Sequence, residues 1–194
     1  PIWTKVVNIF DGRVAKVFAN AASVKMRPAI LDSMAFFKPT YLVDGDLTDL
    51  SLQQLRKDGI KGIIFDLDST LIAPRTARLS DEVATWLSLA REEFKLAVVS
   101  NNKNDVYMQQ VQSVLNMPVL GRAAKPATKV FLQVLADFEL PPHEVVVVGD
   151  RPLTDIWGGQ RAGMKTALVM PLKTQIESKL VIIARKLERC FIRS

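Results

Sequence analysis

The stretch GIIFDLDST, residues 62–70, decides the fold of this chain. Its apolar beginning, Ile63 to Phe65, is typical of a buried strand, and it leads into Asp66 and Asp68, two carboxylates separated by one residue. Like charges this close repel each other, which raises the free energy of the doubly ionised pair. In open α/β sheets, ligands bind at the carboxyl ends of strands. We therefore expect this turn to supply a carboxylate nucleophile, a metal ligand and a proton-transfer partner.

Outward from this stretch, short β-branched runs alternate with segments of helical periodicity. Such alternation is typical of βαβ units, in which helices join parallel strands. The runs are apolar at consecutive positions, as in strands that are buried on both faces. The expected strands are 61–65, 95–99, 117–120, 144–148 and 165–169. A short helix is expected at 51–57, before the first strand, and further helices are expected between the strands at 81–93, 104–115 and 128–138. The sequence thus predicts a three-layer, Rossmann-like α/β fold with a central parallel sheet.

Basic residues gather at the two ends of the chain, which has 194 residues and a formal net charge of +6. Residues 1–40 carry six Lys or Arg against two Asp, residues 171–194 carry six against two Glu, and residues 41–170 carry 14 basic and 16 acidic residues. Apolar residues recur at helical spacing in 2–22 and 172–191, with basic residues between them. We expect three regions: a basic amphipathic helical segment at 1–40, a catalytic domain at 41–170 and a basic amphipathic helix at 171–194.

Several classes of protein are disfavoured by the composition. Lys5 and Asp11 interrupt the first apolar stretch, so we expect no signal peptide, and no run approaches the roughly 18 uninterrupted apolar residues of a membrane span. Cys190 is the single cysteine, which excludes an intrachain disulfide and suits a reducing compartment. His143 follows two prolines and is expected to be solvated. Basic residues do not alternate with stacking aromatic residues, so no nucleic-acid partner is expected.

Three further polar groups follow predicted strands or precede a predicted helix. Ser100 and Asn101 follow the second of the strands, where a hydroxyl and backbone N–H groups can bind a phosphate. Lys125 precedes the last of the predicted helices, and an ammonium group there would offset charge on phosphoryl oxygens. Asp150 follows a run of four valines, and Asp155 comes five residues later. Carboxylates gathered around a phosphate suit Mg²⁺, which prefers oxygen ligands.

Taken together and in this order, the four sites resemble the motifs of the haloacid dehalogenase (HAD) superfamily of phosphohydrolases. The matching stretches are DLDST at 66–70, VVSNN at 98–102, Lys125 in AKP, and GDRPLTD at 149–155. The resemblance covers about residues 58–170.

This resemblance implies a role for each matching residue. Asp66 would attack phosphorus and form an aspartyl-phosphate. Asp68 would protonate the leaving oxygen and later deprotonate the hydrolytic water. The implied phosphate-binding residues are Ser100, Asn101 and Lys125, and the implied Mg²⁺ ligands are Asp66, Asp68 through its backbone carbonyl, Asp150 and Asp155.

HAD enzymes usually select substrates with an inserted cap domain, for which this chain has no room. Between Asp66 and Ser100 lie 33 residues, and between Ser100 and Lys125 lie 24, enough for a helix and a strand in each interval. We therefore expect a capless, open site. Such a site suits a phosphate displayed on a protein, a nucleic acid or a membrane better than a small soluble substrate. The cationic amphipathic ends favour an anionic membrane surface.

More narrowly, the chain is similar to the YqeG-type group of HAD subfamily IIIA, which includes phosphatidylglycerophosphatases. The similarity rests on KPTY at 38–41, GIKG at 59–62 and GDRPLTDIWGGQRAG at 149–163. Ser69 departs from the group, in which Asn is expected. The similarity implies removal of the terminal phosphate of phosphatidylglycerophosphate by a cytoplasmic protein that associates peripherally with the inner face of a membrane.

Two alternatives remain open at this stage. One is a HAD phosphatase that acts on a soluble phosphorylated metabolite or a protein, and the other is a membrane-associated adaptor that keeps the fold without catalysis. Either terminal helix can pack on the domain instead of binding a membrane. Four basic residues in or near loops after strand ends are candidates for the second phosphate of a lipid substrate, and equally for ordinary surface charges: Arg75, Lys103, Arg122 and Arg151.

Overall fold

A computed structural model describes residues 38–172, with the exception of Arg75. All of them belong to the unit formed by residues 36–194. The helices expected at 2–22 and 172–191 lie outside the described residues, apart from Leu172, so the division into three regions stays a prediction.

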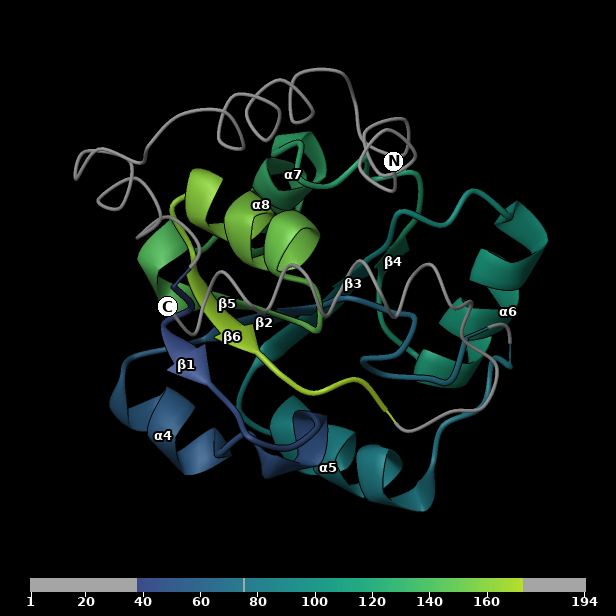
Figure 1. Cartoon of the computed structure of the whole chain (residues 1–194), viewed down its shortest axis with the longest axis horizontal. Coiled ribbons are helices and arrows are strands. Elements are labelled where there is room, and N and C mark those ends of the chain that lie inside the picture. Colours follow the sequence, from purple (N-terminus) through teal and green to yellow (C-terminus); the bar gives the residue numbers. More distant parts are fainter. Residues whose placement is uncertain (1–37, 75, 173–194) are drawn as a thin grey trace, which may run out of the picture. The chain divides into compact units, whose positions relative to one another are not determined.

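The described residues build one six-stranded sheet in which every pair of neighbouring strands is parallel (Figure 1). The strand order is β1-β6-β5-β2-β3-β4. The strands are β1 (Tyr41–Leu42), β2 (Gly62–Phe65), β3 (Lys95–Val99), β4 (Val119–Leu120), β5 (Val145–Gly149) and β6 (Lys165–Leu168). β2 lies in the interior of the sheet, between β5 and β3. The DLDST turn, which follows β2, is therefore at the interior of the sheet's carboxyl edge.

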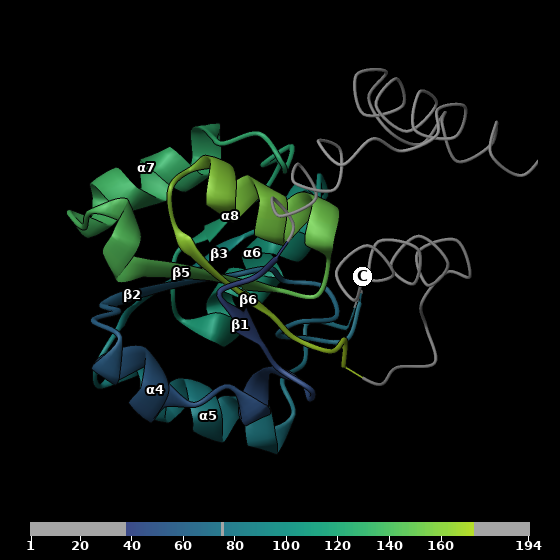
Figure 2. The same cartoon turned by 60° about the vertical axis from the view of Figure 1, so that its left-hand side comes forward.

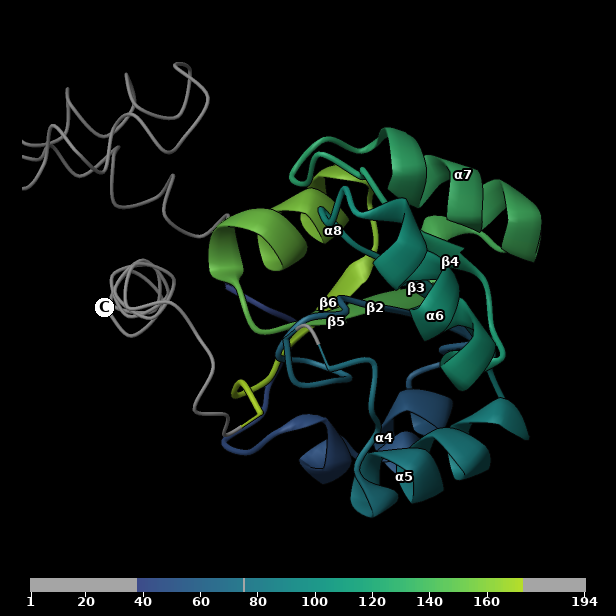
Figure 3. The same ribbon diagram turned by 90° about the vertical axis from the view of Figure 1, so that its right-hand side faces the viewer.

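Helices cover both faces of this sheet, as a three-layer fold requires. α4 and α5 lie on one side, and α7 and α8 lie on the other (Figures 2 and 3). The helices are α4 (Leu52–Lys57), α5 (Asp81–Arg91), α6 (Asp105–Leu115), α7 (Lys129–Phe138) and α8 (Trp157–Arg161), with short 3-10 helices η2 (Leu47–Asp49) and η3 (Pro142–Glu144) and a π-helical turn η4 (Pro152–Ile156). The α/β fold predicted from the sequence is confirmed.

Two hydrophobic cores, one on each side of the sheet, hold the layers together. Successive residues of a strand point to opposite faces, so Ile63 and Phe65 of β2 join the core under α5 and α6, while Ile64 joins the core under α7. The indole of Trp86 meets the Phe65 ring edge-on, with 6.0 Å between ring centroids, and its Nε1 donates a hydrogen bond to the Leu50 carbonyl (3.0 Å). β2 is therefore buried on both faces up to its last residue, and Asp66 follows directly after it.

Side-chain caps set where three of the helices begin. The hydroxyls of Ser51 and Ser80 accept hydrogen bonds from backbone N–H groups in the first turns of α4 and α5. Asn104 Oδ1 accepts from the backbone N–H of Tyr107 (3.1 Å) in the first turn of α6. These bonds satisfy N–H groups that have no partner within the helix. The cap at Asn104 also fixes the start of the helix whose first turn contains Tyr107.

The five expected strands and the four expected helices are all present, within a few residues at their ends. β1 and α8 were not predicted. Four apolar residues of α6 divide between its two faces: Val111 and Leu115 are buried, whereas Val106 and Val114 are 67% and 45% exposed. Tyr107 and Met108 take the buried positions, because these larger side chains remove more apolar surface from water than two valines do.

Neither interval between the expected catalytic residues contains a cap domain. Within residues 66–100, Arg75 apart, the helix α5 and the strand β3 are the regular elements, and within residues 100–125 they are α6 and β4. The site at the carboxyl ends of the strands is therefore uncapped in the described part of the chain. None of the helices described there has both the length and the apolar composition needed to cross a membrane.

A tyrosine ties the edge strand β1 to the loop that precedes β2. The Tyr41 hydroxyl donates to Asp58 Oδ2 (2.6 Å), and Gln54 Nε2 donates to Asp58 Oδ1 (2.9 Å). The bond from Tyr41, and then that from Gln54, hold the pKa of Asp58 below its ordinary value. A carboxyl whose pKa is lowered by folding stabilises the fold above its ordinary pKa, and that contribution is lost as the pH falls through the folded value.

We expect Tyr41→Phe to lower the free energy of unfolding at pH 7, because the ionised Asp58 loses its hydroxyl donor. The difference from the unsubstituted protein should shrink as the pH falls below about 4, because Asp58 is then protonated in the unfolded chain and, at lower pH, in the folded protein as well. Urea unfolding at pH 7 and at pH 3 measures both values. An equal difference at the two pH values would contradict the assignment of the stabilisation to this bond.

Candidate active site

The carboxyl ends of three neighbouring strands bring the predicted residues to one edge of the sheet. Asp66 and Asp68 follow β2, Ser100 follows β3, and Asp150 follows β5. The chain passes from β2 to β3 on one side of β2, whereas β5 lies on its other side, so β2 marks the reversal of strand order at which open α/β sheets bind ligands. The backbone N–H of Asp66 continues the ladder by donating to the Val148 carbonyl (2.8 Å).

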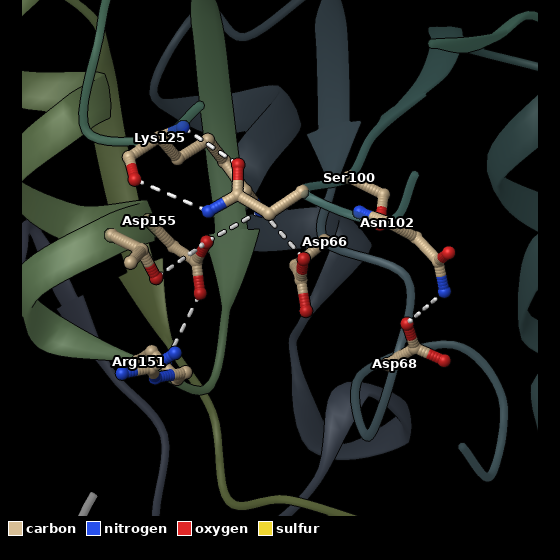
Figure 4. Close-up of polar contacts among 9 residues, drawn as sticks. Asp66, Asp68, Ser100, Asn102, Lys125, Arg151 and Asp155 are labelled. Atoms are coloured by element: carbon tan, nitrogen blue, oxygen red, sulfur yellow. Dashed lines mark hydrogen bonds and ion pairs between the residues drawn. The ribbon is translucent and has the colours of Figure 1, made fainter. Parts of the chain in front are cut away.

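Lys125 lies between two carboxylates that come from different strand ends (Figure 4). Its Nζ is 2.5 Å from Asp66 Oδ1 and 2.7 Å from Asp155 Oδ1. The side chains of Lys125 and Asp155 are 3% and 1% exposed, whereas that of Asp66 is 13% exposed. Asp66 is therefore the most accessible member of this group, as a residue that meets a substrate must be.

The environment sets the charge of each member of this group. Burial raises the pKa of Asp66 to about 6, and the Lys125 ammonium offsets part of that rise. Burial acts to lower the pKa of Lys125, but the carboxylates of Asp155 and Asp66 more than compensate, so its pKa lies above its ordinary value. At neutral pH, Asp66 is therefore mainly a carboxylate, the form a nucleophile needs, and Lys125 is an ammonium.

Asp155 is held from several directions. Besides Lys125, the backbone N–H of Arg151 donates to its Oδ2 (3.1 Å) and the hydroxyl of Thr154 donates to its Oδ1 (3.3 Å). The side chain also packs directly on Gly149: a Cβ added to Gly149 would lie 2.4 Å from Asp155 Oδ2 and 2.5 Å from its Cβ. Glycine at the end of β5 is what allows Asp155 this close approach.

The donor set fits a divalent cation. Asp66, Asp150 and Asp155 each place one carboxylate oxygen within 4.8 Å of the others, and Asp150 is fully buried. Three carboxylates gathered at one buried place repel one another, and positive charge beside them lowers that cost. All three donors are oxygens, the ligands that Mg²⁺ prefers. Of the four predicted ligands, Asp68 contributes no carboxylate oxygen to this group.

The carboxylate of Asp68 is bound instead by two donors from the β3–α6 region. The Tyr107 hydroxyl donates to its Oδ1 (2.9 Å), and Asn102 Nδ2 donates to its Oδ2 (3.3 Å). Neither Tyr107 nor Asn102 was singled out from the sequence as a site residue. Asn102 is the last residue of the VVSNN motif, whereas Tyr107 stands five residues further on, in a helix that the sequence marks only as amphipathic.

The two predicted phosphate-binding residues after β3 have different surroundings. Ser100 is 2% exposed, and its Oγ accepts a hydrogen bond from the backbone N–H of Asn102 (3.1 Å), which leaves the hydroxyl hydrogen to be donated. The Asn101 side chain binds the backbone of Lys125 at both ends: Oδ1 accepts from the Lys125 N–H (2.6 Å), and Nδ2 donates to its carbonyl (3.2 Å). Asn101 thus fixes the loop that carries Lys125.

The remaining candidates are dispersed. Lys103 is exposed, Arg122 is paired with Asp105 (2.8 Å), and Arg75 lies outside the described residues. Arg151 contributes its backbone N–H to Asp155, as described above. His143 is exposed in η3, just before β5 and so at the opposite end of that strand from Asp150, as its expected solvation requires.

Comparison with known proteins agrees with this geometry. The HAD-hydrolase-like family model matches residues 122–179. Probable phosphatase YqeG of Bacillus subtilis (strain 168) is 33% identical over 138 residues, which are 71% of this chain and 79% of that protein. Phosphatidylglycerophosphate phosphatase 1, chloroplastic, of Chlamydomonas reinhardtii is 31% identical over 162 residues, 78% of this chain and 60% of the algal protein.

The fold also has a counterpart among solved structures. An uncharacterized protein from Listeria monocytogenes serotype 4b superposes with a TM-score of 0.50 at 16% identity, over 70% of this chain and all of that one. At this identity the likeness concerns the fold alone. The fold and the similarity to named phosphatases together define a HAD-type phosphatase. Because one relative is one-third identical over most of both chains, the protein belongs to the YqeG family within that superfamily.

Gly149→Ala should weaken metal binding, because the new methyl group would displace the carboxylate of Asp155. We expect the affinity for Mg²⁺ to fall by about 10- to 100-fold, the usual effect of disturbing the support of a metal ligand. Calorimetric titration of the purified protein with Mg²⁺ measures this without reference to turnover.

Gly62→Ala is the matched control for this substitution. A Cβ there would also be overcrowded, at 2.9 Å from a ring carbon of Phe138 and 3.0 Å from a methyl carbon of Leu140, but Gly62 begins β2, at the opposite end of that strand from Asp66. It should reduce the free energy of unfolding and leave the Mg²⁺ affinity within about twofold, since distant sites act independently. Equal losses of affinity in the two variants would show that general overpacking is responsible.

Proposed function

We propose that the protein is a Mg²⁺-dependent phosphomonoester hydrolase that works through an aspartyl-phosphate on Asp66. The observation that carries the proposal is the position of Asp66: a partly exposed carboxylate at a buried strand end, in contact with the Lys125 ammonium and grouped with Asp150 and Asp155. A carboxylate nucleophile needs nearby positive charge, because its target, a phosphate ester, is itself an anion.

In the first step, a carboxylate oxygen of Asp66 attacks phosphorus and the bond to the leaving oxygen breaks. Asp68 donates its proton to that oxygen, so the alcohol leaves uncharged. In the second step, Asp68 takes a proton from a water molecule as the water attacks phosphorus, and this releases inorganic phosphate and regenerates Asp66. Lys125 and the Ser100 hydroxyl bind the phosphoryl oxygens throughout.

Mg²⁺ would be held by Asp66, Asp150 and Asp155 together with the backbone carbonyl of Asp68. When bound there, it supplies the positive charge that balances the carboxylates and the phosphoryl oxygens.

We infer that the substrate is phosphatidylglycerophosphate, which loses its terminal phosphate to give phosphatidylglycerol at a membrane surface. The uncapped site supports a substrate displayed on a large surface. Two relatives that are 31% and 29% identical to this chain bear the name phosphatidylglycerophosphate phosphatase 1, although this chain spans only 60% and 45% of their lengths. The basic ends predicted to be amphipathic helices would bring the protein to the cytoplasmic side of an anionic membrane as a peripheral protein.

Asp66→Asn should reduce turnover of any phosphomonoester substrate by a factor on the order of 10³ or more, because the amide cannot form the covalent intermediate. Acid quenching during turnover, followed by hydroxylamine cleavage, should detect an acyl-phosphate in the unsubstituted protein and none in the variant. Asp137→Asn, at an exposed position of α7, should retain full activity. Substantial hydrolysis by Asp66→Asn would refute the assignment of the nucleophile.

Phosphate release from phosphatidylglycerophosphate in anionic vesicles should exceed release from sugar phosphates, nucleotides and phosphopeptides at equal phosphate concentration. The physical reason is that the open site encloses little of a soluble ligand, whereas a membrane presents the phosphate and adds contacts of its own. A preference for a soluble compound would replace the lipid with the metabolite or protein alternative. Binding to anionic vesicles without turnover of any substrate would favour the non-catalytic adaptor.

A further inference from the structure

Asp68 is held by a hydrogen-bonded bracket whose two members come from outside its own loop. Tyr107 binds one carboxylate oxygen at 2.9 Å and Asn102 binds the other at 3.3 Å. The contacts span 39 and 34 residues of sequence, so the bracket exists only when α6 packs beside the DLDST turn. We propose that Tyr107 is a positioning residue that orients the Asp68 carboxyl for proton transfer to the leaving group, an inference that rests on the proposed phosphatase mechanism.

Tyr107 is itself anchored firmly enough to orient another side chain. Tyr107 is 8% exposed and belongs to the hydrophobic core under α5 and α6. Its backbone N–H is bound by the cap Asn104 at the start of α6. Because the backbone of Tyr107 is bound by the cap and its ring is packed in the core, the hydroxyl is held at one place. Little conformational entropy of the side chain remains to be lost when the bond to Asp68 forms.

The turn that carries Asp68 needs such an external support. Ser69, the next residue, adopts a left-handed backbone conformation with φ of 70°, which is unfavourable for a residue with a Cβ. The turn is closed by the bond from the Ser69 N–H to the Ile72 carbonyl (2.8 Å), but these are backbone contacts and do not set the side-chain torsions of Asp68. The two bonds from Tyr107 and Asn102 do.

A tyrosine hydroxyl suits a group that must gain and lose a proton in each cycle. It is uncharged, and it both donates and accepts hydrogen bonds. The contact with Asp68 can therefore persist in both protonation states, whereas a lysine or arginine would favour the carboxylate alone. The Asn102 bond is the longer of the two, so the oxygen it binds, Oδ2, is the one more readily released to face the leaving group.

The test uses the dependence of rate on the leaving group. Protonation by Asp68 matters most for alcohols that leave poorly as anions and little for acidic phenols, so a misplaced acid should affect only the former. The value of kcat/KM reports the first irreversible step, in which the leaving group departs, and it excludes the later hydrolysis of the aspartyl-phosphate. A series of substituted phenyl phosphates and alkyl phosphates covers the required range of leaving-group pKa.

For Tyr107→Phe we expect kcat/KM to fall by about tenfold for alkyl phosphates and by less than about twofold for p-nitrophenyl phosphate, since only part of the contribution of general acid catalysis is lost. A plot of log kcat/KM against leaving-group pKa should become steeper. Asp68→Asn should show the same pattern with a larger loss.

Tyr41→Phe is the matched control, because Tyr41 is the other tyrosine of the chain and also donates its hydroxyl to an aspartate, Asp58. Asp58 precedes β2 and so lies at the opposite end of that strand from Asp66, outside the catalytic group. It should leave the slope of the plot unchanged.

Three results would overturn the inference. They are an equal loss for all leaving groups in Tyr107→Phe, no loss at all, or a steeper slope in Tyr41→Phe as well. The inference and the proposed function fail in different ways. If the unsubstituted protein hydrolyses none of these esters, the proposed function fails. If it does and Asp68→Asn steepens the slope while Tyr107→Phe does not, the role of Tyr107 alone is wrong.

Discussion

The ion pairs of Lys125 with Asp66 and Asp155 are the interaction on which the rest of the site depends. Two carboxylates come from separate strand ends and approach the same Nζ at 2.5 and 2.7 Å. Without that ammonium, the buried carboxylates of Asp66 and Asp155 would repel each other and push apart the loops that carry them. A third carboxylate, that of Asp150, is buried in the same group. A region organised in this way is better suited to binding a cation and an anionic ester than to stabilising the fold.

The support of this group extends into the surrounding backbone. Asn101 fixes the loop that carries Lys125, and Gly149 gives Asp155 space at the end of β5. These contacts use residues next to the reactive groups, and each constrains a side chain or loop that would otherwise be mobile. The acid/base candidate Asp68 is bound by other donors, Asn102 and Tyr107. The nucleophile and the proton donor are thus supported by different side chains, although only one residue separates them in the sequence.

The sequence predicted the parallel sheet and placed Asp66, Ser100, Lys125 and Asp150 at the same edge, because each follows an apolar run or precedes an amphipathic helix. Asp155 was identified from the GDRPLTD motif alone. It did not reveal α8, which contains Gly158 and Gly159, residues that disfavour helix by about 1 kcal/mol each. The structure explains these glycines: a Cβ at either position would lie within 3 Å of Phe131, or of Val147 and Thr166. The strand β1 at the sheet edge has only two residues, too few to show the alternation of apolar and polar residues that marks a strand. Tyr107 was missed because its partner is 39 residues away in the sequence, and no local pattern reveals a contact of that range.

The distance in sequence between the interacting groups has a consequence for folding. Lys125 reaches Asp66 across 59 residues and Asp155 across 30, and the parallel sheet that aligns them contains no local hairpin. Contacts of this range form late, after long loops have been closed. No fragment of the chain assembles the nucleophile, its ammonium partner and the acidic group on its own. Recovery of activity on refolding therefore reports completion of the whole sheet, whereas helix content, which depends on local contacts, would return earlier.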